Sequence, residues 1–524
     1  MMRKMMCLLL GVGGCQDDSV SSTPRSQFTE SQWQTLQSLA ELPDPPPDLS
    51  NKYRDNPAAV TLGQKFYFDP SFSGPSTLKD TLGQSFAPEQ GRAPLGQSVD
   101  ISCNSCHDVS QHAGSDPEES HVSIGVGAYD VNGQSTINSA YYDLLYWNGR
   151  NDSLWAQIVA VGESPVSMGG NRLKTAWRIA DAYRTEYEAV FGADHPLPTQ
   201  MDTVAAQKLR LDADGTCVLD VGLVCPELCH EVTNTETLAA ACVPRFPLHG
   251  KTGRQADCQW ADATDPIESL KDAFDCMTPE DRATVTRIYV NFAKAIAAYE
   301  TQLVSRNAAF DAFVAEGPES EQISESAKAG AKLFIGEGWC VQCHGTPLFS
   351  DNLFHDIGVP QVGDFVPATA DCPEGASCDC VNGTNCLPWG LRDGLAKLQG
   401  NKFRRDSSWS DDPNVGVTLH DWYATPLSDA QKGQWRTPSL RSVALTAPYM
   451  HNGMYGTLEE VVGHYEIGSQ KKELIVGEVD SRVGDMALTE DDVAALVAFM
   501  EALTGEELPV ELVTKPVLPA PSGF

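Results

Sequence analysis

The sequence has little positive charge and no long apolar run. Among its 524 residues, 37 are Lys or Arg and 71 are Asp or Glu, which gives a formal net charge of −34. This balance argues against binding to nucleic acid, because phosphates are held by cationic side chains, and it suits a partner with a basic face. No apolar run reaches the roughly 18 residues that a membrane-spanning helix needs. Hydrophobic residues make up 41% of the chain, enough for a sizeable core, and the length predicts about three domains.

The first residues indicate that the protein leaves the cytoplasm. Arg3 and Lys4 precede a short apolar stretch, as in a secretory signal. Residues 12–15 read Val-Gly-Gly-Cys and resemble a bacterial lipobox, in which Cys15 becomes the lipidated N-terminus. An ordinary secretory signal cut nearby is the alternative. We expect residues 1–15 to be a lipoprotein signal peptide, residues 16–50 to be a semi-rigid linker, and the protein to be a periplasmic or outer-membrane lipoprotein of a Gram-negative-type bacterium.

Sixteen cysteines are more than a reduced cytosolic enzyme usually carries. Ten of them form two even-numbered clusters: Cys217, Cys225, Cys229, Cys242, Cys258 and Cys276, then Cys372, Cys378, Cys380 and Cys386. In an exported chain, disulfides within each cluster are the default expectation, three in the first and two in the second. A metal site that includes His230 beside Cys229 is the alternative. Most of these cysteines lie in residues 209–263 and 361–433.

Four further cysteines belong to two C-x-x-C-H motifs. The first is Cys103, Cys106 and His107, and the second is Cys340, Cys343 and His344. This pentapeptide is the attachment signal for c-type haem, because two thiols bond to the vinyl groups and the adjoining His ligates the iron. Two copies in an exported chain predict two covalently bound haem c groups, with His107 and His344 as proximal iron ligands.

Apolar periodicity predicts a mainly α fold. Residues 61–68 and 328–335 echo each other, and each is expected to be a helix that precedes a haem motif. One apolar face runs from Val285 to Leu303. Near the C-terminus, Thr489 can cap a helix with Asp492 at the third position, and Gly505 stops it.

The repeat divides the chain into two haem domains. We expect the N-terminal haem domain to span residues 51–320 with a Cys-rich insertion at 209–263. The C-terminal haem domain is expected at 321–505 with a Cys-containing insertion at 361–433. Residues 506–524 are rich in proline and are expected to form a tail.

Several further motifs occur in the same order around the two haem sites. They are Leu62–Pro70, Ser123–Gly125, Tyr146–Arg150, Asn291–Asn307, Phe349–Pro360, Arg436–Gly453 and Thr457–Glu460. With the C-x-x-C-H pentapeptides, they resemble the bacterial di-haem cytochrome c peroxidase family that includes MauG. The resemblance covers most of residues 55–208 and 280–505, and the two Cys-containing segments look like insertions.

The resemblance implies a division of labour between two packed cytochrome c-like domains. In that family the N-terminal haem reacts with peroxide, and the six-coordinate C-terminal haem passes electrons to it. Trp147 matches the Trp that bridges the haems; a buried core aromatic is the alternative. The family's calcium ligands fall on Asn132, Thr446 and Pro448, the last two through backbone carbonyls, and such oxygen donors suit a hard cation.

Two positions near the N-terminal haem depart from the family pattern. Val126 stands where the family often has a His that caps the iron, so we expect this haem to be open at rest; His112 and His121 are nearby substitutes. Gln157 matches the distal Gln, but the distal Glu is replaced by Ser167. Ser has no accessible ionisation near neutral pH, so it cannot serve alone as the general acid or base. Glu163 is a candidate substitute.

The distal ligand of the C-terminal haem is predicted to be Tyr465. Peroxidases of the family often supply Met at this position, whereas MauG-like members have Tyr, and phenolate stabilises ferric iron. His464 is the rival, but neighbours on a helix point about 100° apart, so only one can ligate. His451 also matches a family position and is expected beside the haem rather than on the iron.

These features together predict an exported di-haem oxidoreductase of the peroxidase type. Its expected substrate is hydrogen peroxide, and its expected electron donor is a small redox protein. With Ser167 and Val126 in place, oxidation of a protein side chain, as by MauG, or dihaem oxygenase chemistry is a second option. The rival class is a non-enzymatic di-haem electron carrier, for which two haems and Trp147 would suffice. Turnover of peroxide with a reduced cytochrome c separates the classes.

Overall fold

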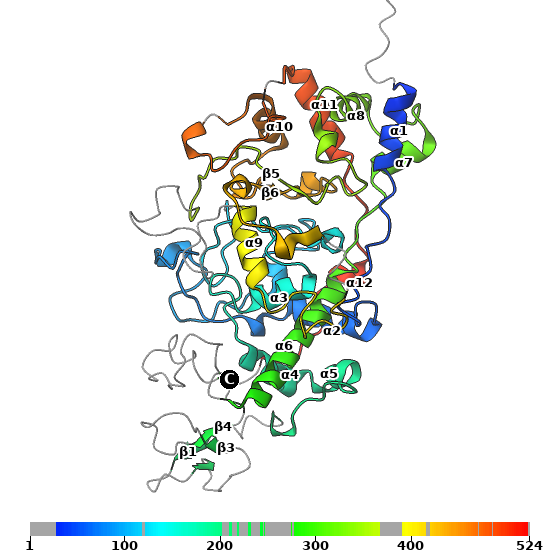
Figure 1. Ribbon diagram of the computed structural model, residues 1–524. Helices are drawn as coiled ribbons and strands as arrows, with labels where there is room; N and C mark the ends of the chain where they lie inside the picture. The colour runs from blue at the N-terminus through cyan, green and yellow to red at the C-terminus, as the bar shows by residue number, and fades with distance from the viewer. Residues whose placement is uncertain are drawn as a thin grey trace, which may run out of the picture.

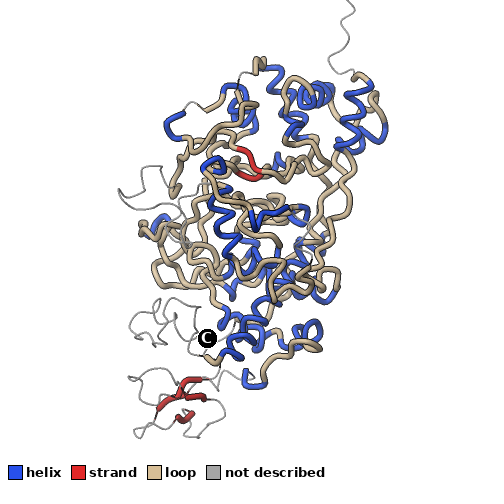
Figure 2. Tube along the Cα trace, viewed as in Figure 1, coloured by secondary structure: helices blue, strands red, loops and turns tan. Residues whose placement is uncertain are grey.

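The computed structural model describes residues 28–117, 121–201, 277–366, 390–414, 420–469, 471–484 and 486–521, four short strands within 209–244, and residues 246 and 274. Over these residues the fold is mainly helical, as predicted (Figures 1 and 2). The α-helices are α1 (Glu30–Leu39), α2 (Pro57–Phe68), α3 (Leu154–Gly162), α4 (Arg172–Ala182), α5 (Arg184–Phe191), α6 (Pro279–Glu300), α7 (Ala309–Glu316), α8 (Glu325–Ile335), α9 (Leu391–Gly400), α10 (Leu458–Ile467), α11 (Glu490–Glu501) and α12 (Val510–Val513).

The strands are short and pair only as antiparallel couples. β1 (Leu209–Leu211) pairs with β2 (Cys217–Leu219), and β3 (Cys229–Glu231) pairs with β4 (Cys242–Pro244). β5 (Phe354–His355) pairs with β6 (Trp435–Arg436) inside the second half of the molecule. The expected disulfides of both cysteine clusters lie outside the described side chains, as do the signal peptide and Cys15. Among the described helices, none has the length and apolar character to cross a membrane.

The first hydrophobic core forms around the α2–α6 helix pair. The predicted helix over 61–68 is confirmed, and the predicted 285–303 helix ends at Glu300, so Leu303 follows it. A Cβ on Gly63 would lie 1.9 Å from the carbonyl oxygen of Ala295, so glycine is what allows the two backbones to approach this closely. Cys103 packs against this core, which places the first haem motif beside it.

A second core repeats this construction with α8 and α11. The predicted helix over 328–335 is confirmed within α8, and the predicted capping box between Thr489 and Asp492 begins α11. Helix α11 ends at Glu501, four residues before Gly505. A Cβ on Gly330 would lie 1.9 Å from the carbonyl oxygen of Ala495. Gly63 and Gly330 are equivalent in the sequence repeat, and the second core carries Cys340 as the first carries Cys103.

Each end of the chain packs on the core of the opposite half. Helix α1 lies within the segment expected to be a linker, yet it packs on the second core through Leu36 and Leu39, beside α7 and α8 (Figure 1). It packs there because one of its faces is apolar. The proline-rich stretch that follows it is what favours a linker in the sequence. The C-terminal tail returns to the first core, where the carbonyl oxygen of Leu512 accepts a hydrogen bond from Tyr299 at 2.7 Å. Both halves are therefore tied together at their ends.

Candidate haem sites and the residues between them

The second C-x-x-C-H motif is arranged as a haem attachment site. Cys340 begins a short 3₁₀ helix (Cys340–Gln342), and neither Cys340 nor Cys343 is in a disulfide. His344 is buried, and its Nδ1 donates a hydrogen bond to the carbonyl oxygen of Phe349 at 2.6 Å. This contact fixes the tautomer and leaves Nε2 with its lone pair. Burial lowers the pKa of His344, which keeps the ring neutral. These residues fit a covalently held haem.

A cavity of about 240 Å³ opens in front of this motif. It brings together residues that are more than 300 positions apart in the chain. Those that matter for the site are Asn132, Trp147, Cys340, Cys343, His344, Arg436, Thr446, Pro448, His451 and Tyr465. The structure therefore places Trp147, Tyr465 and the three expected calcium ligands around the same space as the second haem motif.

Tyr465 and His464 occupy different environments on α10. Tyr465 lines the cavity, and burial raises the pKa of its hydroxyl above the ordinary value for Tyr. His464 points away, and both its ring nitrogens are used: Nε2 donates to the carbonyl oxygen of Ile357 at 2.7 Å, and Nδ1 accepts from the hydroxyl of Tyr455 at 2.9 Å. A His with no free nitrogen cannot ligate iron without losing a buried hydrogen bond. The geometry favours Tyr465.

His451 lies flat against Trp435 on the cavity wall. The two ring centroids are 4.0 Å apart with planes 15° from parallel, and Nε2 of His451 accepts from the side-chain amide of Gln361 at 3.2 Å. Burial lowers the pKa of His451 to about 3, so the ring is neutral at physiological pH. His451 thus lines the cavity that the second haem motif also lines, and its place beside a haem stays a prediction.

The first C-x-x-C-H motif has the same local architecture. Cys103 begins a 3₁₀ helix (Cys103–Ser105), and both thiols are free of disulfides. Nδ1 of His107 faces the carbonyl oxygen of Gly114 at 3.3 Å, and burial lowers the pKa of His107. Tyr67 from α2 donates to the carbonyl oxygen of His107 at 2.8 Å, which ties the motif to the first core. These residues also fit a haem.

Val126 and Ser167 lie against each other across two loops. The backbone N–H of Val126 donates to the carbonyl oxygen of Ser167 at 2.8 Å, and that of Gly127 donates to Val166 at 3.2 Å. Val126 is buried, so the position at which the family often has a His is filled here by an enclosed apolar side chain. The structure thus brings together the two positions at which the sequence departs from the family pattern.

The two histidines considered as substitutes at the Val126 position, His112 and His121, are each held through one ring nitrogen. His112 Nδ1 is 3.1 Å from a carboxylate oxygen of Asp108, and His121 Nδ1 donates to the carbonyl oxygen of Gly453 at 2.8 Å. His121 thereby joins the first half of the chain to the second.

Glu163 is engaged in an ion pair with Arg172. Its carboxylate accepts three hydrogen bonds from Arg172: from the backbone N–H at 3.0 Å, from Nε at 3.0 Å and from Nη2 at 2.7 Å. The Arg172 side chain is 8% exposed and that of Glu163 is 17% exposed. The pair joins the C-terminus of α3 to the start of α4, so it has a structural role.

Sequence reasoning missed a polar cluster beside Gln157. The hydroxyl of Tyr146 donates to the carbonyl oxygen of Gln157 at 3.4 Å, and the guanidinium carbon of Arg150 lies 3.5 Å from the centre of the Tyr146 ring. Arg150 also donates to the hydroxyl of Tyr129. The signal was present in the Tyr146–Arg150 motif, whose turn is closed by a bridge between Leu145 and Asn151.

Trp147 is held at the boundary between the two halves. Its indole Nε1 donates to the carbonyl oxygen of Asn132 at 2.8 Å, and its own carbonyl oxygen accepts from the backbone N–H of Arg436 at 2.8 Å. Nδ2 of Asn132 donates to the carbonyl oxygen of Pro448 at 2.6 Å. These contacts join Asn132 both to Trp147 and to Pro448 in the second half.

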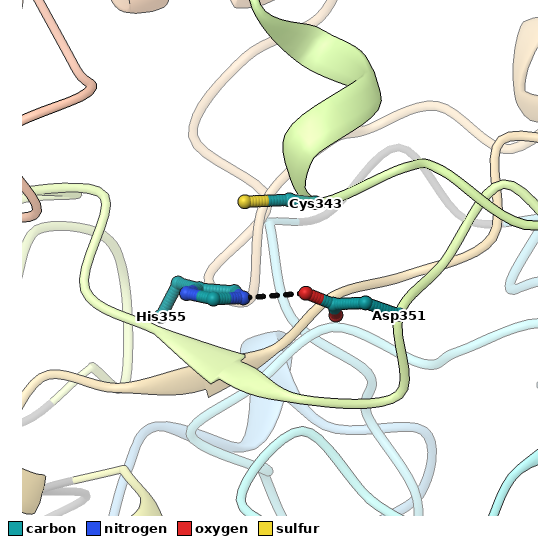
Figure 3. Close-up of side chains that lie close together, drawn as sticks. All are labelled: Cys343, Asp351 and His355. Atoms are coloured by element: carbon teal, nitrogen blue, oxygen red, sulfur yellow. Dashed lines mark hydrogen bonds and ion pairs between the residues drawn. The ribbon is translucent and has the colours of Figure 1, made fainter. Parts of the chain in front are cut away.

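A charged group next to Cys343 was also not anticipated from the sequence. Asp351 and His355 face each other below the Cys343 sulfur, and their polar atoms lie within 4.8 Å of one another (Figure 3). Cys, Asp and His together are a possible set of metal ligands. Haem attachment would convert the Cys343 thiol to a thioether, however, which removes the anionic sulfur that a metal requires.

Comparison with known proteins agrees with this arrangement. Residues 57–209 match the family model of the di-haem cytochrome c peroxidases. The cytochrome-c peroxidase IdrP2 of Denitromonas iodatirespirans is 36% identical over 220 residues, which are 42% of this chain and 50% of that protein. The methylamine utilization protein MauG of Methylorubrum extorquens is 30% identical over 218 residues, 42% of this chain and 45% of that protein. The matches thus span about half the length of these relatives.

The fold has a counterpart among solved structures. The diheme peroxidase BthA of Burkholderia thailandensis superposes with a TM-score of 0.50 and 19% identity, over 89% of this chain and 92% of that chain. This likeness concerns the fold and covers both halves of the molecule. The chain is thus a relative of the di-haem cytochrome c peroxidases and MauG, and residues 57–209 carry the domain of that family.

Proposed function

We propose that this protein is an exported di-haem c-type oxidoreductase that reduces hydrogen peroxide, or uses it to oxidise a substrate, at its N-terminal haem. The observation that carries the proposal is the shared cavity, because its lining includes a haem motif, Tyr465 and Trp147, which lies at the boundary to the other half. Cys103, Cys106 and His107 would hold one haem in a domain spanning 51–320. Cys340, Cys343, His344 and Tyr465 would hold the other in a domain spanning 321–505.

Haem c supplies an iron that exchanges single electrons and binds small oxygen ligands where a coordination position is open. The residues of this chain set access and ligation. With Val126 in place of a His, one face of the N-terminal site would keep no protein ligand, and the amide side chain of Gln157 would be the hydrogen-bonding group there. Tyr465 would close the C-terminal site to external ligands. Trp147 contacts Arg436 and Asn132, which lie in the two halves, and so suits a bridging role.

We also propose that calcium binds at the boundary. Asn132, Thr446 and Pro448 line one cavity, and Asn132 and Pro448 are in direct contact. Oxygen ligands from an amide and from backbone carbonyls are typical of calcium sites. An ion there would hold the Trp147 loop against the second half, because Trp147 donates to the carbonyl oxygen of Asn132.

The electron donor is proposed to be a small redox protein with a basic face. The net charge of −34 favours such a partner through long-range attraction. The lipobox-like start of the chain supports attachment of the mature protein to a membrane through Cys15, with periplasmic exposure of the haem domains.

The test is peroxide consumption by the purified di-haem protein with a reduced small cytochrome c as donor. We expect oxidation of two donor molecules for each hydrogen peroxide, because reduction of peroxide to two waters takes two electrons and two protons. A Trp147→Phe variant should slow donor oxidation while both haems remain attached. If that variant instead loses both haems, Trp147 is a buried core aromatic and not a bridge between the haems.

A second function, a non-enzymatic electron carrier, is favoured by one specific observation. The carboxylate of Glu163 is consumed by Arg172, so it does not replace the acid that Ser167 lacks. A protein that exchanges electrons quickly with cytochrome c but does not consume peroxide would be such a carrier.

A further inference from the structure

Four charged side chains surround the Cys343 edge of the cavity. His355 Nε2 is 2.8 Å from Asp351 Oδ2, and His355 Nδ1 is 3.2 Å from Arg482 Nη2 and 3.7 Å from Asp480 Oδ2. Arg482 Nε in turn donates to Asp480 Oδ1 at 2.8 Å. The side chains of His355, Asp351, Asp480 and Arg482 are 16%, 17%, 22% and 31% exposed, so water reaches the group. We call these four residues the His355 network.

The His355 network is built into the haem site by its backbone contacts. The N–H of Asp351 donates to the carbonyl oxygen of Cys343 at 2.9 Å. His355 lies opposite Trp435 in the β5–β6 pair, and the next residue, Arg436, donates to the carbonyl oxygen of Trp147. His355, Asp480 and Arg482 all line the cavity. One short ladder therefore connects the Cys343 edge to Trp147.

The hydrogen bonds of His355 suit a ring that changes protonation. In the neutral ring, Nε2–H donates to Asp351 and Nδ1 accepts from Arg482. A second proton on Nδ1 would face the Arg482 guanidinium, which disfavours it, but also the Asp480 carboxylate, which favours it. Asp351 stabilises the charged ring, and His344 and Asp356 are the other titratable groups near this edge. Neighbours of both signs therefore surround the His355 ring: the two carboxylates favour its charged form, and the Arg482 guanidinium favours its neutral form.

Haem attachment should lower the pKa of His355 toward neutral pH. Hydrogen bonds with Asp351 and Cys343 raise the pKa of His355 to about 9. A thioether sulfur carries no negative charge, so the contribution of Cys343 disappears once the haem is bound. The remaining neighbours are two carboxylates and one guanidinium.

We propose that His355 takes up a proton from water when the C-terminal haem site takes up an electron, and returns it when the electron moves on through Trp147. This inference rests on the proposed haem at Cys340, Cys343 and His344. One electron from the donor protein enters the iron and one proton from solvent binds Nδ1, so the site's net charge is unchanged. The added negative charge makes the imidazolium a weaker acid, by about tenfold for a unit charge within the same cavity. His355 is a positioning residue, since it acts through the haem.

The test is the midpoint potential of the C-terminal haem as a function of pH, measured by spectroelectrochemistry on the intact di-haem protein. We expect the potential to be higher and flat at acid pH, to fall where His355 titrates, and to be flat again at alkaline pH. His355→Gln should abolish the fall and leave the low-spin spectrum intact. Arg482→Gln removes the cation that opposes protonation, so it should move the fall to higher pH.

The matched control is His112→Gln. His112 pairs with Asp108 four residues earlier at 3.1 Å, as His355 pairs with Asp351, but it lies beside the first haem motif. It should leave the pH dependence of the C-terminal haem unchanged. A wild-type potential that does not vary with pH, or a fall that persists in His355→Gln, overturns the inference. Peroxide turnover is measured separately, so loss of turnover with an intact pH dependence would reject the proposed function and not this one.

Discussion

Replacement of Glu163 by Gln separates a structural role from a catalytic one. Glu163, four residues before Ser167, is the candidate substitute for the missing distal acid, whereas the structure gives its carboxylate to Arg172 through three hydrogen bonds. Gln keeps the length and one acceptor oxygen but loses the negative charge. Arg172, which is largely buried, would then lose the carboxylate that accepts three of its hydrogen bonds.

The expected cost follows from the burial of the pair. Removing one partner of a buried ion pair typically costs about 3–5 kcal/mol, because the other charge remains desolvated. The Glu163 side chain is 17% exposed and that of Arg172 is 8% exposed. Water therefore reaches the carboxylate to some extent, and Gln can still accept one bond. We expect a loss of about 3 kcal/mol, near the lower end of that range.

The assay is urea unfolding followed by far-UV circular dichroism, with peroxide turnover measured below the transition. The matched control is Glu186→Gln, because Glu186 pairs with Lys65 at 3.1 Å with side chains 40% and 24% exposed. A pair of this kind contributes about 0–1 kcal/mol. Glu163→Gln should lower the midpoint much more than Glu186→Gln, at an unchanged slope.

The opposite pattern would refute the argument. If Glu163→Gln unfolds at the same urea concentration as the wild type but loses turnover by about a hundredfold, the carboxylate acts as a general acid or base. The ion pair with Arg172 would then be one state of a residue that also serves the distal site.

Three other predictions concern the haem and calcium sites. Tyr465→Phe should convert the C-terminal haem from low-spin to high-spin in electron paramagnetic resonance, whereas His464→Ala should not, because both His464 nitrogens are already bonded; the reverse result would make His464 the ligand. Cys340→Ala should leave one stably attached haem of two in pyridine haemochrome analysis, and an unchanged count would contradict the attachment site. Asn132→Ala should weaken calcium binding in isothermal titration calorimetry, and equal affinity in variant and wild type would place the ion elsewhere.

Local signals in the sequence were sufficient for the haem motifs and for most helices. The C-x-x-C-H spacing needs no tertiary information, because thiols and imidazole lie within one turn of the same chain. The capping box of Thr489 and Asp492 is equally local, and it begins α11 as predicted. The Gly63 and Gly330 positions were visible as a repeat, although only the helix pairs explain why glycine stands there.

Tertiary structure decided the features that depend on residues far apart in the chain. Adjacent residues Tyr465 and His464 differ because α10 turns one to the cavity and the other to Ile357. Arg172 is only nine residues from Glu163 in the chain, yet the packing of α4 decides that its guanidinium reaches the carboxylate. Helix α1 packs on a core built almost 300 residues later, so its burial was invisible locally. Side-chain chemistry can be read along the chain, but whether a group is free to act depends on partners that only folding brings near.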